Sequence, residues 1–225
     1  MMPARIVPPA APDTLPVLKR RGVMLVLASP PGGGKTTITR EIAKRDPGTV
    51  ISVSATTRQQ RPGEVEGQHY YFVSKEKFEQ MIKAGDMMEH ALVYNSHFYG
   101  TPKKPVEKAL TEGRDVLFDI DWQGNKSLSA IAKDDVVSVF LLPPSWDELA
   151  HRLHNRAQDS EEEIIRRLGK AHDEITHYRE FQYVIVNHNL EESITKVRAI
   201  LEAERQKRDR LIGIQSFVDT LKPGK

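Results

Sequence analysis

Residues 29–37 read Ser29-Pro30-Pro31-Gly32-Gly33-Gly34-Lys35-Thr36-Thr37 and directly follow the apolar run from Val23 to Ala28. Here Gly34-Lys35-Thr36 matches the end of the phosphate-binding loop pattern G-x-x-x-x-G-K-[ST], whereas the first position holds Ser29 instead of glycine. Glycines let backbone N–H groups turn inward around phosphate oxygens, where side chains would clash. Because strand, loop and helical pattern follow in that order, we interpret the stretch as a nucleotide-binding loop and not as a plain glycine-rich turn.

Each part of this loop suits a nucleoside triphosphate. The helix that we predict from Thr36 to Lys44 adds the positive end of its dipole to the loop. Lys35 would reach the β- and γ-phosphates of ATP, and the Thr36 hydroxyl would ligate Mg²⁺. The residues that we expect around ATP are Pro31, Gly32, Gly33, Gly34, Lys35, Thr36 and Thr37.

Four or five apolar segments along the chain are typical of buried strands, and most are continuous runs rather than alternating ones. That pattern indicates parallel strands covered on both faces, so we predict an α/β fold with right-handed crossovers and helices on both faces of the sheet. The strand segments are Val23 to Ala28, Val50 to Val53, Asp115 to Ile120, Val136 to Leu142 and Tyr183 to Val186. The later helical segments are Trp146 to Arg156, Glu161 to Tyr178 and Leu190 to Leu211.

Residues 54–113 interrupt this alternation. They contain short alternating patches such as Tyr70-Tyr71-Phe72-Val73. An interruption of roughly 60 residues is too long for a loop without structure of its own, so we predict a small insert with its own sheet. A second polar, arginine-rich stretch covers residues 147–167. The core then comprises residues 20–53, 114–146 and 168–215, with tails at 1–19 and 216–225.

Composition limits the possible functions. The 225 residues carry a net charge of +2, which is too near neutral to suggest bulk binding to nucleic acid or to a membrane. Cysteine is absent, which removes a disulfide framework, a thiolate metal site and a cysteine nucleophile, and fits a reducing cytoplasm. No apolar run reaches about 18 residues, so no transmembrane helix is expected. The proline-rich start, Met1 to Pro16, lacks the apolar stretch of a signal peptide.

The segment from Ser54 to Tyr70 gathers hydroxyl groups and two arginines within a short stretch. Arginine forks suit a phosphate monoester, and serine and tyrosine hydroxyls can complete the shell around its oxygens. Such residues more often form a solvated basic loop. From these residues alone both interpretations stay open.

Together with the phosphate loop, these segments resemble the guanylate kinase family, whose members use ATP to phosphorylate GMP. The resemblance runs from about Gly22 to Leu211, and its motifs occur in the family's order. They are Thr56-Thr57-Arg58, Arg61-Pro62-Gly63-Glu64, Gly67, Tyr70, Glu89-His90-Ala91, Tyr99-Gly100-Thr101, Asp119-Ile120-Asp121-Trp122-Gln123-Gly124, Arg152-Leu153, Arg156, Arg166-Arg167-Leu168 and Val184-Ile185-Val186-Asn187. The resemblance implies a P-loop kinase core, a GMP-binding insert at residues 54–113 and a helical lid at residues 147–167.

The resemblance also implies a role for each matching site residue. Asp119 resembles the residue near Mg²⁺ and the phosphates, with Thr36 as the other metal-site residue, through water or directly. The residues that resemble those holding the GMP phosphate are Ser54, Arg58, Arg61, Tyr70 and Tyr99. Those that resemble the readers of the guanine edge are Glu89, Thr101 and Asp121. The catalytic set implied in this way is Lys35, Arg58, Asp119, Arg152, Arg156 and Arg167, with the last three around the transferred phosphoryl group.

The spacing of residues leads to one further prediction, and the sequence departs from the family pattern at two places. Asp119 and Asp121 are two residues apart, so they share one strand face if the strand extends that far. The segment Tyr94-Asn95-Ser96-His97-Phe98 suggests a one-residue insertion near the GMP site. Ala157-Gln158 stands where the family's lid has glycine and threonine after the arginine, although Arg156 is retained.

The sequence therefore predicts an ATP:GMP phosphotransferase with Mg²⁺ as cofactor, ATP and GMP as its small-molecule partners, and neither nucleic acid nor a membrane as a partner. No covalent intermediate is expected, because phosphoryl transfer depends on positioning and charge neutralisation. Two alternatives are weighed against it. A binding module that has lost catalysis is disfavoured by the intact Gly34-Lys35-Thr36, and a kinase for phosphorylated sugars is disfavoured by Glu89 and Asp121.

Overall fold

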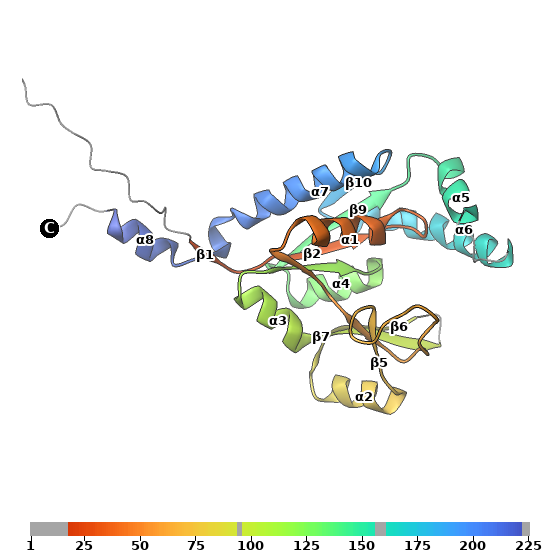
Figure 1. Cartoon of the computed structure of the whole chain (residues 1–225), viewed down its shortest axis with the longest axis horizontal. Coiled ribbons are helices and arrows are strands. Elements are labelled where there is room, and N and C mark those ends of the chain that lie inside the picture. The colour runs from red at the N-terminus through yellow and green to blue at the C-terminus, as the bar shows by residue number, and fades with distance from the viewer. Residues whose placement is uncertain (1–17, 94–95, 156–160, 222–225) are drawn as a thin grey trace, which may run out of the picture.

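The core of the molecule is a sheet of five parallel strands in the order β10-β9-β2-β8-β3 (Figure 1). The computed structural model describes residues 18–93, 96–155 and 161–221. The five strands are β2 Met24–Ala28, β3 Thr49–Ile51, β8 Asp115–Asp119, β9 Val136–Leu142 and β10 Tyr183–Val186. This arrangement confirms the predicted parallel sheet, and the predicted strand ends agree to within one or two residues.

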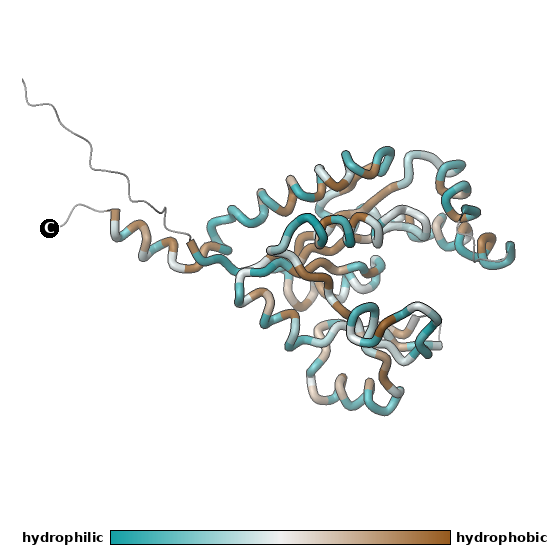
Figure 2. The backbone as a smooth tube through the Cα atoms, in the orientation of Figure 1, coloured by the Kyte–Doolittle hydropathy of each residue, from teal (hydrophilic) through white to brown (hydrophobic). Residues whose placement is uncertain are grey.

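Helices cover both faces of this sheet because successive side chains of each strand point to opposite faces and both sets are apolar. Leu25 and Leu27 of β2 belong to the cluster on one face, and Met24 and Val26 belong to the cluster on the other. Figure 2 shows hydrophobic residues concentrated along the central strands and on the inner sides of the helices. The helices are α1 Lys35–Arg45 and α7 Leu190–Arg205 on the first face, and α3 Lys103–Thr111 and α4 Trp122–Ile131 on the second.

Residues 54–102 form a second, mixed sheet at one side of the core, which fits the predicted insert with a sheet of its own (Figure 1). Its strand order is β5-β4-β7-β6, and Phe78 of its helix stacks on Phe98 at 5.4 Å between ring centroids. These elements are β4 Ser54–Thr56, β5 Tyr70–Phe72, α2 Lys75–Lys83, β6 Met87–Val93 and β7 His97–Pro102. Helix α3, which follows β7, packs in the cluster that covers the core sheet.

Two helices follow β9 and form a small apolar cluster of their own. They are α5 Trp146–His154 and α6 Glu161–Ile175, and the cluster contains Leu149, Leu153 and Ile164. Ser145 caps α5, since its hydroxyl accepts a hydrogen bond from the Glu148 N–H at 3.1 Å. The last part of the predicted helix to Tyr178 is a short 3₁₀ helix, Thr176–Glu180.

The C-terminal region corrects two predictions. The helix expected to reach Leu211 ends at Arg205, and β11 Leu211–Ile212 pairs with β1 Lys19–Arg20. The predicted tail at 216–225 instead begins inside the helix α8 Ile214–Thr220. The predicted helix was too long because Arg210 is buried and donates to the backbone oxygens of Gly22 and Asp134. These contacts are long-range, so the local sequence pattern does not show them. Within the described ranges, no helix is long and apolar enough to cross a membrane.

Candidate active site

The phosphate loop connects β2 to α1 at the carboxyl end of the central strand. Gly32 and Gly34 have φ values of 85° and 99°, a left-handed conformation that other residues rarely adopt. The Gly33 N–H donates to the Pro30 oxygen at 2.9 Å, which tightens the turn. Helix α1 begins at Lys35, one residue earlier than predicted, so its free N–H groups face the loop. The local geometry is that of an anion cradle.

Ser29 fits at the first loop position because residue 33 is glycine. The Ser29 side chain is buried, and its hydroxyl donates to the Pro30 oxygen at 2.9 Å. A Cβ atom at Gly33 would lie 2.6 Å from the Ser29 Cβ, closer than two carbon atoms can approach. The departure from the loop pattern is therefore accommodated locally by Gly33.

Lys35 and Asp119 form an ion pair at the carboxyl ends of two neighbouring strands. The Lys35 Nζ lies 2.8 Å from Asp119 Oδ1, and Asp119 is the last residue of β8, which pairs with β2. Burial disfavours the ammonium, but the Asp119 carboxylate more than compensates and raises the pKa of Lys35 above its ordinary value. Lys35 is therefore charged at neutral pH, and Tyr70 and Asp121 also lie within its electrostatic reach.

Arg58 is held between two partners at the edge of the second sheet. Its guanidinium makes two parallel hydrogen bonds to the Glu64 carboxylate, at 2.7 and 3.0 Å, and its Nε donates to the Tyr99 hydroxyl at 3.3 Å. The Tyr70 ring lies 5.3 Å from the guanidinium carbon. Three of the predicted phosphate-holding residues thus gather in one place, and Glu64 occupies the fork that an anionic ligand would use.

The other two residues predicted for this phosphate lie nearby along the chain. Ser54 begins β4 and is the register partner of Tyr70 on β5. Arg61 contributes its backbone N–H to Glu64 Oε2 at 2.8 Å. The Arg61 residue is exposed, and its positive charge helps to lower the pKa of Glu64.

Glu89 is buried on β6 and faces Thr101 on β7. The Thr101 hydroxyl donates to Glu89 Oε1 at 2.7 Å, and the two residues are register partners across the strands. Burial raises the pKa of Glu89 to about 7, and the negative charge of Asp121 adds to this shift. The carboxyl is therefore about half protonated near neutral pH.

Asp121 does not share a strand face with Asp119, because β8 ends at Asp119. Asp121 is instead the N-cap of α4, where its Oδ1 accepts from the Gly124 N–H at 2.9 Å. The cap does not use the second carboxylate oxygen. The negative charge of Asp121 raises the pKa of both Lys35 and Glu89.

Two of the arginines predicted to surround the transferred phosphoryl group, Arg152 and Arg167, have different partners. Arg152 on α5 donates to the backbone oxygen of Asn187 at 3.1 Å and to Glu148 at 2.7 Å, which brings it beside the phosphate loop. Arg167 pairs with Glu163 of its own helix at 2.8 Å. Arg156, like Tyr94-Asn95 and Ala157-Gln158 of the two departures, lies outside the described residues.

Three residues of this site were not among those predicted for it. Glu64 and Asn187 stood in motifs that the sequence displays, but their roles depend on contacts with Arg58 and with the loop. Glu174 on α6 has its pKa raised to about 7, first by burial and then by the charge of Asp121. Nothing in the local sequence around Glu174 distinguishes it from an exposed helical glutamate.

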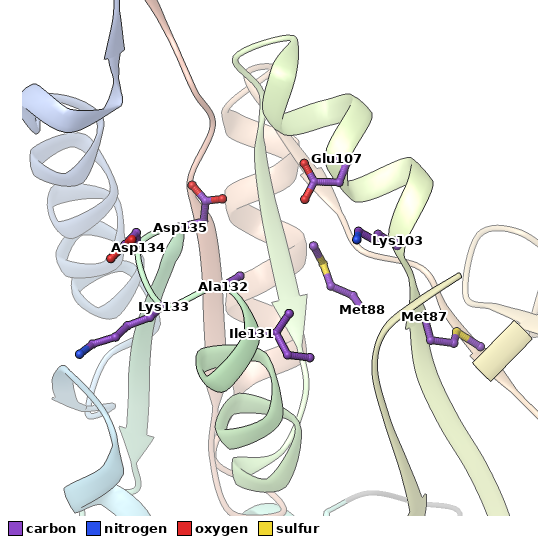
Figure 3. Close-up of a pocket in the computed structure, with 9 residues that line it drawn as sticks. All are labelled: Met87, Met88, Lys103, Glu107, Ile131, Ala132, Lys133, Asp134 and Asp135. Carbon is purple, nitrogen blue, oxygen red and sulfur yellow. The ribbon is translucent and has the colours of Figure 1, made fainter. Parts of the chain in front are cut away.

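A cavity of about 390 Å³ lies where α3, the end of α4 and the start of β6 meet. Figure 3 shows the side chains of Met88 and Ile131 between these elements. The lining residues are Met87, Met88, Lys103, Glu107, Ile131, Ala132, Lys133, Asp134 and Asp135. None of them is a predicted site residue, so this cavity is distinct from the candidate active site.

Comparison with known proteins gives a consistent result. The family model described as guanylate kinase matches residues 21–204. The guanylate kinase of Paramagnetospirillum magneticum is 54% identical over 212 residues, which covers 94% of this chain and 99% of the relative. That of Rhodospirillum rubrum is 51% identical over 214 residues, covering 95% and 98%. The crystal structure of guanylate kinase from Anaplasma phagocytophilum has a TM-score of 0.76 at 37% identity, covering 92% of this chain and 99% of that one.

Proposed function

Because the chain belongs to the guanylate kinase family, we propose that this site transfers the γ-phosphoryl group of ATP to the phosphate of GMP, giving ADP and GDP. One observation supports the assignment: Lys35 of the loop forms an ion pair with Asp119 at 2.8 Å, and its charge also interacts with Tyr70 on the second sheet and with Asp121. In this proposal the donor and acceptor phosphates both lie near the Lys35 ammonium. A coupled assay of ADP release with ATP and Mg²⁺ tests the proposal, since the rate should depend on GMP.

On the donor side, the loop N–H groups, the start of α1 and the Lys35 ammonium supply positive charge for the triphosphate. Thr36 and Asp119 offer the oxygen ligands that Mg²⁺ prefers, and a single carboxylate suits an ion that also binds phosphates and water. The described residues contain no group of three or more acidic or histidine side chains that would form a metal cage. When bound, Mg²⁺ neutralises charge on the phosphates.

On the acceptor side, we infer that the GMP phosphate takes over the Arg58 fork that Glu64 now occupies. A phosphate monoester carries a charge of nearly −2 and can accept the same two parallel hydrogen bonds. Tyr70 and Tyr99 are already at this fork, and Ser54 and Arg61 complete the shell of donors in this proposal. The GMP phosphate oxygen is itself the nucleophile, so no covalent intermediate with the enzyme is needed.

Arg152, with Arg156 and Arg167, would surround the transferred phosphoryl group when residues 147–167 close as a lid. Arg152 supports this role, because it already lies beside the phosphate loop. Closure would expel water and limit hydrolysis of ATP. Residues 54–113 remain our proposal for the GMP-binding unit, and a cytoplasmic location and the absence of nucleic-acid partners remain predictions.

Lysine at position 58 should impair the use of GMP selectively. Arg58→Lys keeps the charge but removes the planar fork, so we expect kcat/KM for GMP to fall by about 10- to 100-fold. The KM for ATP should stay within about twofold. Steady-state kinetics for both substrates provide the measurement, with Arg208→Lys, an exposed arginine paired only with its neighbour Asp209 in the described contacts, as the control. Equal weakening of both substrates would indicate a folding defect and contradict the assignment.

The use of GMP should increase with pH around neutrality. Guanine presents N–H donors, so Glu89 must be a carboxylate to accept them, yet its pKa of about 7 leaves it protonated at lower pH. Below pH 7, kcat/KM for GMP should fall by up to about tenfold per pH unit. The GMP phosphate titrates near pH ~6, and Glu89→Gln isolates that contribution. Parallel pH profiles for the wild type and Glu89→Gln would contradict the role of Glu89.

A further inference from the structure

Asn187 is a buried residue that contacts the phosphate loop from behind, directly after β10. Its side-chain Nδ2 donates to the Gly33 backbone oxygen at 3.0 Å, and its Oδ1 accepts from the Ser193 hydroxyl at 2.8 Å. The backbone N–H of Asn187 donates to the Leu142 oxygen at 2.8 Å, which fixes the residue to the end of β9. Because a carbonyl oxygen only accepts, the amide nitrogen must be the atom that faces Gly33.

This contact fixes the direction of one peptide group in the loop. The peptide bond between Gly33 and Gly34 is trans, so its C=O and its N–H point in opposite directions. An oxygen held by Asn187 therefore turns the Gly34 N–H away from Asn187. A rotation of this peptide group would exchange the two and direct an oxygen at the bound phosphates. Both residues are glycines, which resist such a rotation less than other residues.

We propose that Asn187 is a positioning residue that keeps the Gly33–Gly34 peptide in the orientation that binds ATP. The inference rests on the proposed function, in which this loop holds the phosphates. Gly34 fits this role, since a Cβ atom there would lie 2.6 Å from the Asn187 Nδ2. The backbone oxygen of Asn187 also accepts from Arg152 at 3.1 Å, so one residue supports both the loop and an arginine of the transfer site.

Aspartate at position 187 tests this role with almost no change in shape. In Asn187→Asp, a carboxylate oxygen faces the Gly33 oxygen, and the repulsion favours the rotated peptide. At pH 8 we expect the KM for ATP to rise and kcat to fall, each by about tenfold or more, while the KM for GMP changes by less than about twofold. The defect should shrink at pH 6, because a protonated carboxyl can donate to Gly33 again.

Asn189→Asp is the matched control, two residues away. Asn189 is the N-cap of α7 and accepts from the Glu192 N–H at 3.1 Å, a role that aspartate fills equally well. Its kinetics should equal those of the wild type. If Asn187→Asp does not fold, Ser193→Ala decides the matter, since it removes the hydroxyl that holds the Asn187 amide and should raise the KM for ATP by about threefold or more.

The outcomes separate this inference from the function on which it rests. A wild type that forms ADP from ATP and GMP, with Asn187→Asp unchanged at pH 8, would overturn the role of Asn187 alone. A defect that affects GMP as much as ATP, or that does not respond to pH, would also overturn it. If Asn187→Asp does not fold, an unchanged KM for ATP in Ser193→Ala would overturn the role of Asn187. A wild type that shows no turnover with GMP would instead refute the proposed function.

Discussion

Replacing Lys35 with alanine should lower kcat by about 10²- to 10³-fold or more, because the ammonium stabilises charge that develops as the phosphoryl group transfers. Asp119 holds the Lys35 ammonium beside the loop at 2.8 Å and keeps it protonated. A contact made mainly in the transition state lowers kcat and kcat/KM together, and that joint loss is the expected kinetic signature of Lys35→Ala.

Lys44→Ala provides the control for this prediction. Lys44 lies on the same helix but is exposed, so its removal should leave turnover unchanged. Thermal unfolding of each variant shows whether the fold survives. Turnover near the wild-type rate in folded Lys35→Ala would contradict the assignment of the loop as the catalytic phosphate site.

We expect two carboxylates to determine which nucleobase the acceptor site binds. Guanine offers its N1–H and its 2-amino group as donors, and Glu89 with Asp121 supplies acceptors. Adenine presents an acceptor at N1 and has no 2-amino group, which would leave buried acceptors unpaired at a cost of about 1–3 kcal/mol each. Sites built on such hydrogen bonds can reject a wrong substrate by about 10⁴-fold. We therefore expect strong preference for GMP over AMP, with IMP between them.

Glu89→Gln tests which residue sets this preference. The amide N–H groups of glutamine can face the N–H donors of guanine, which disfavours GMP. The ratio of kcat/KM for GMP to that for AMP should therefore fall by about 10-fold or more, while the KM for ATP stays unchanged. Glu112→Gln, an exposed glutamate after α3, should leave the ratio unchanged. Comparable efficiency of the wild type with AMP and GMP would remove the guanine assignment and leave only a general nucleotide kinase.

The parts of the fold that could be predicted are those governed by local sequence. The five core strands are continuous apolar runs, so their burial shows in the sequence itself. The pairing of β1 with β11 does not show, because Lys19-Arg20 and Leu211-Ile212 are short and lie at opposite ends of the chain. The burial of Arg210 could not be predicted for the same reason, since its partners Gly22 and Asp134 lie far away along the chain.

The site shows the same division. Lys35 and Asp119 could be predicted because Lys35 ends the loop motif that follows an apolar strand, and Asp119 is the last residue of another such strand. The end of β8 at Asp119 made the expected shared face with Asp121 wrong, since the Asp121 side chain caps α4 instead. The role of Asn187 was hidden because its loop partner lies 154 residues away in sequence. Only the order of the sheet, in which β9 separates β10 from β2, brings the two together.

GMP-dependent phosphoryl transfer is tested by incubating the protein with ATP, Mg²⁺ and GMP and quantifying both nucleotide products by chromatography. We expect GDP and ADP to form in equal amounts, and neither to form at a comparable rate when GMP is omitted. ATP binding without GMP-dependent formation of GDP would contradict this expectation and would favour a binding module that has lost catalysis.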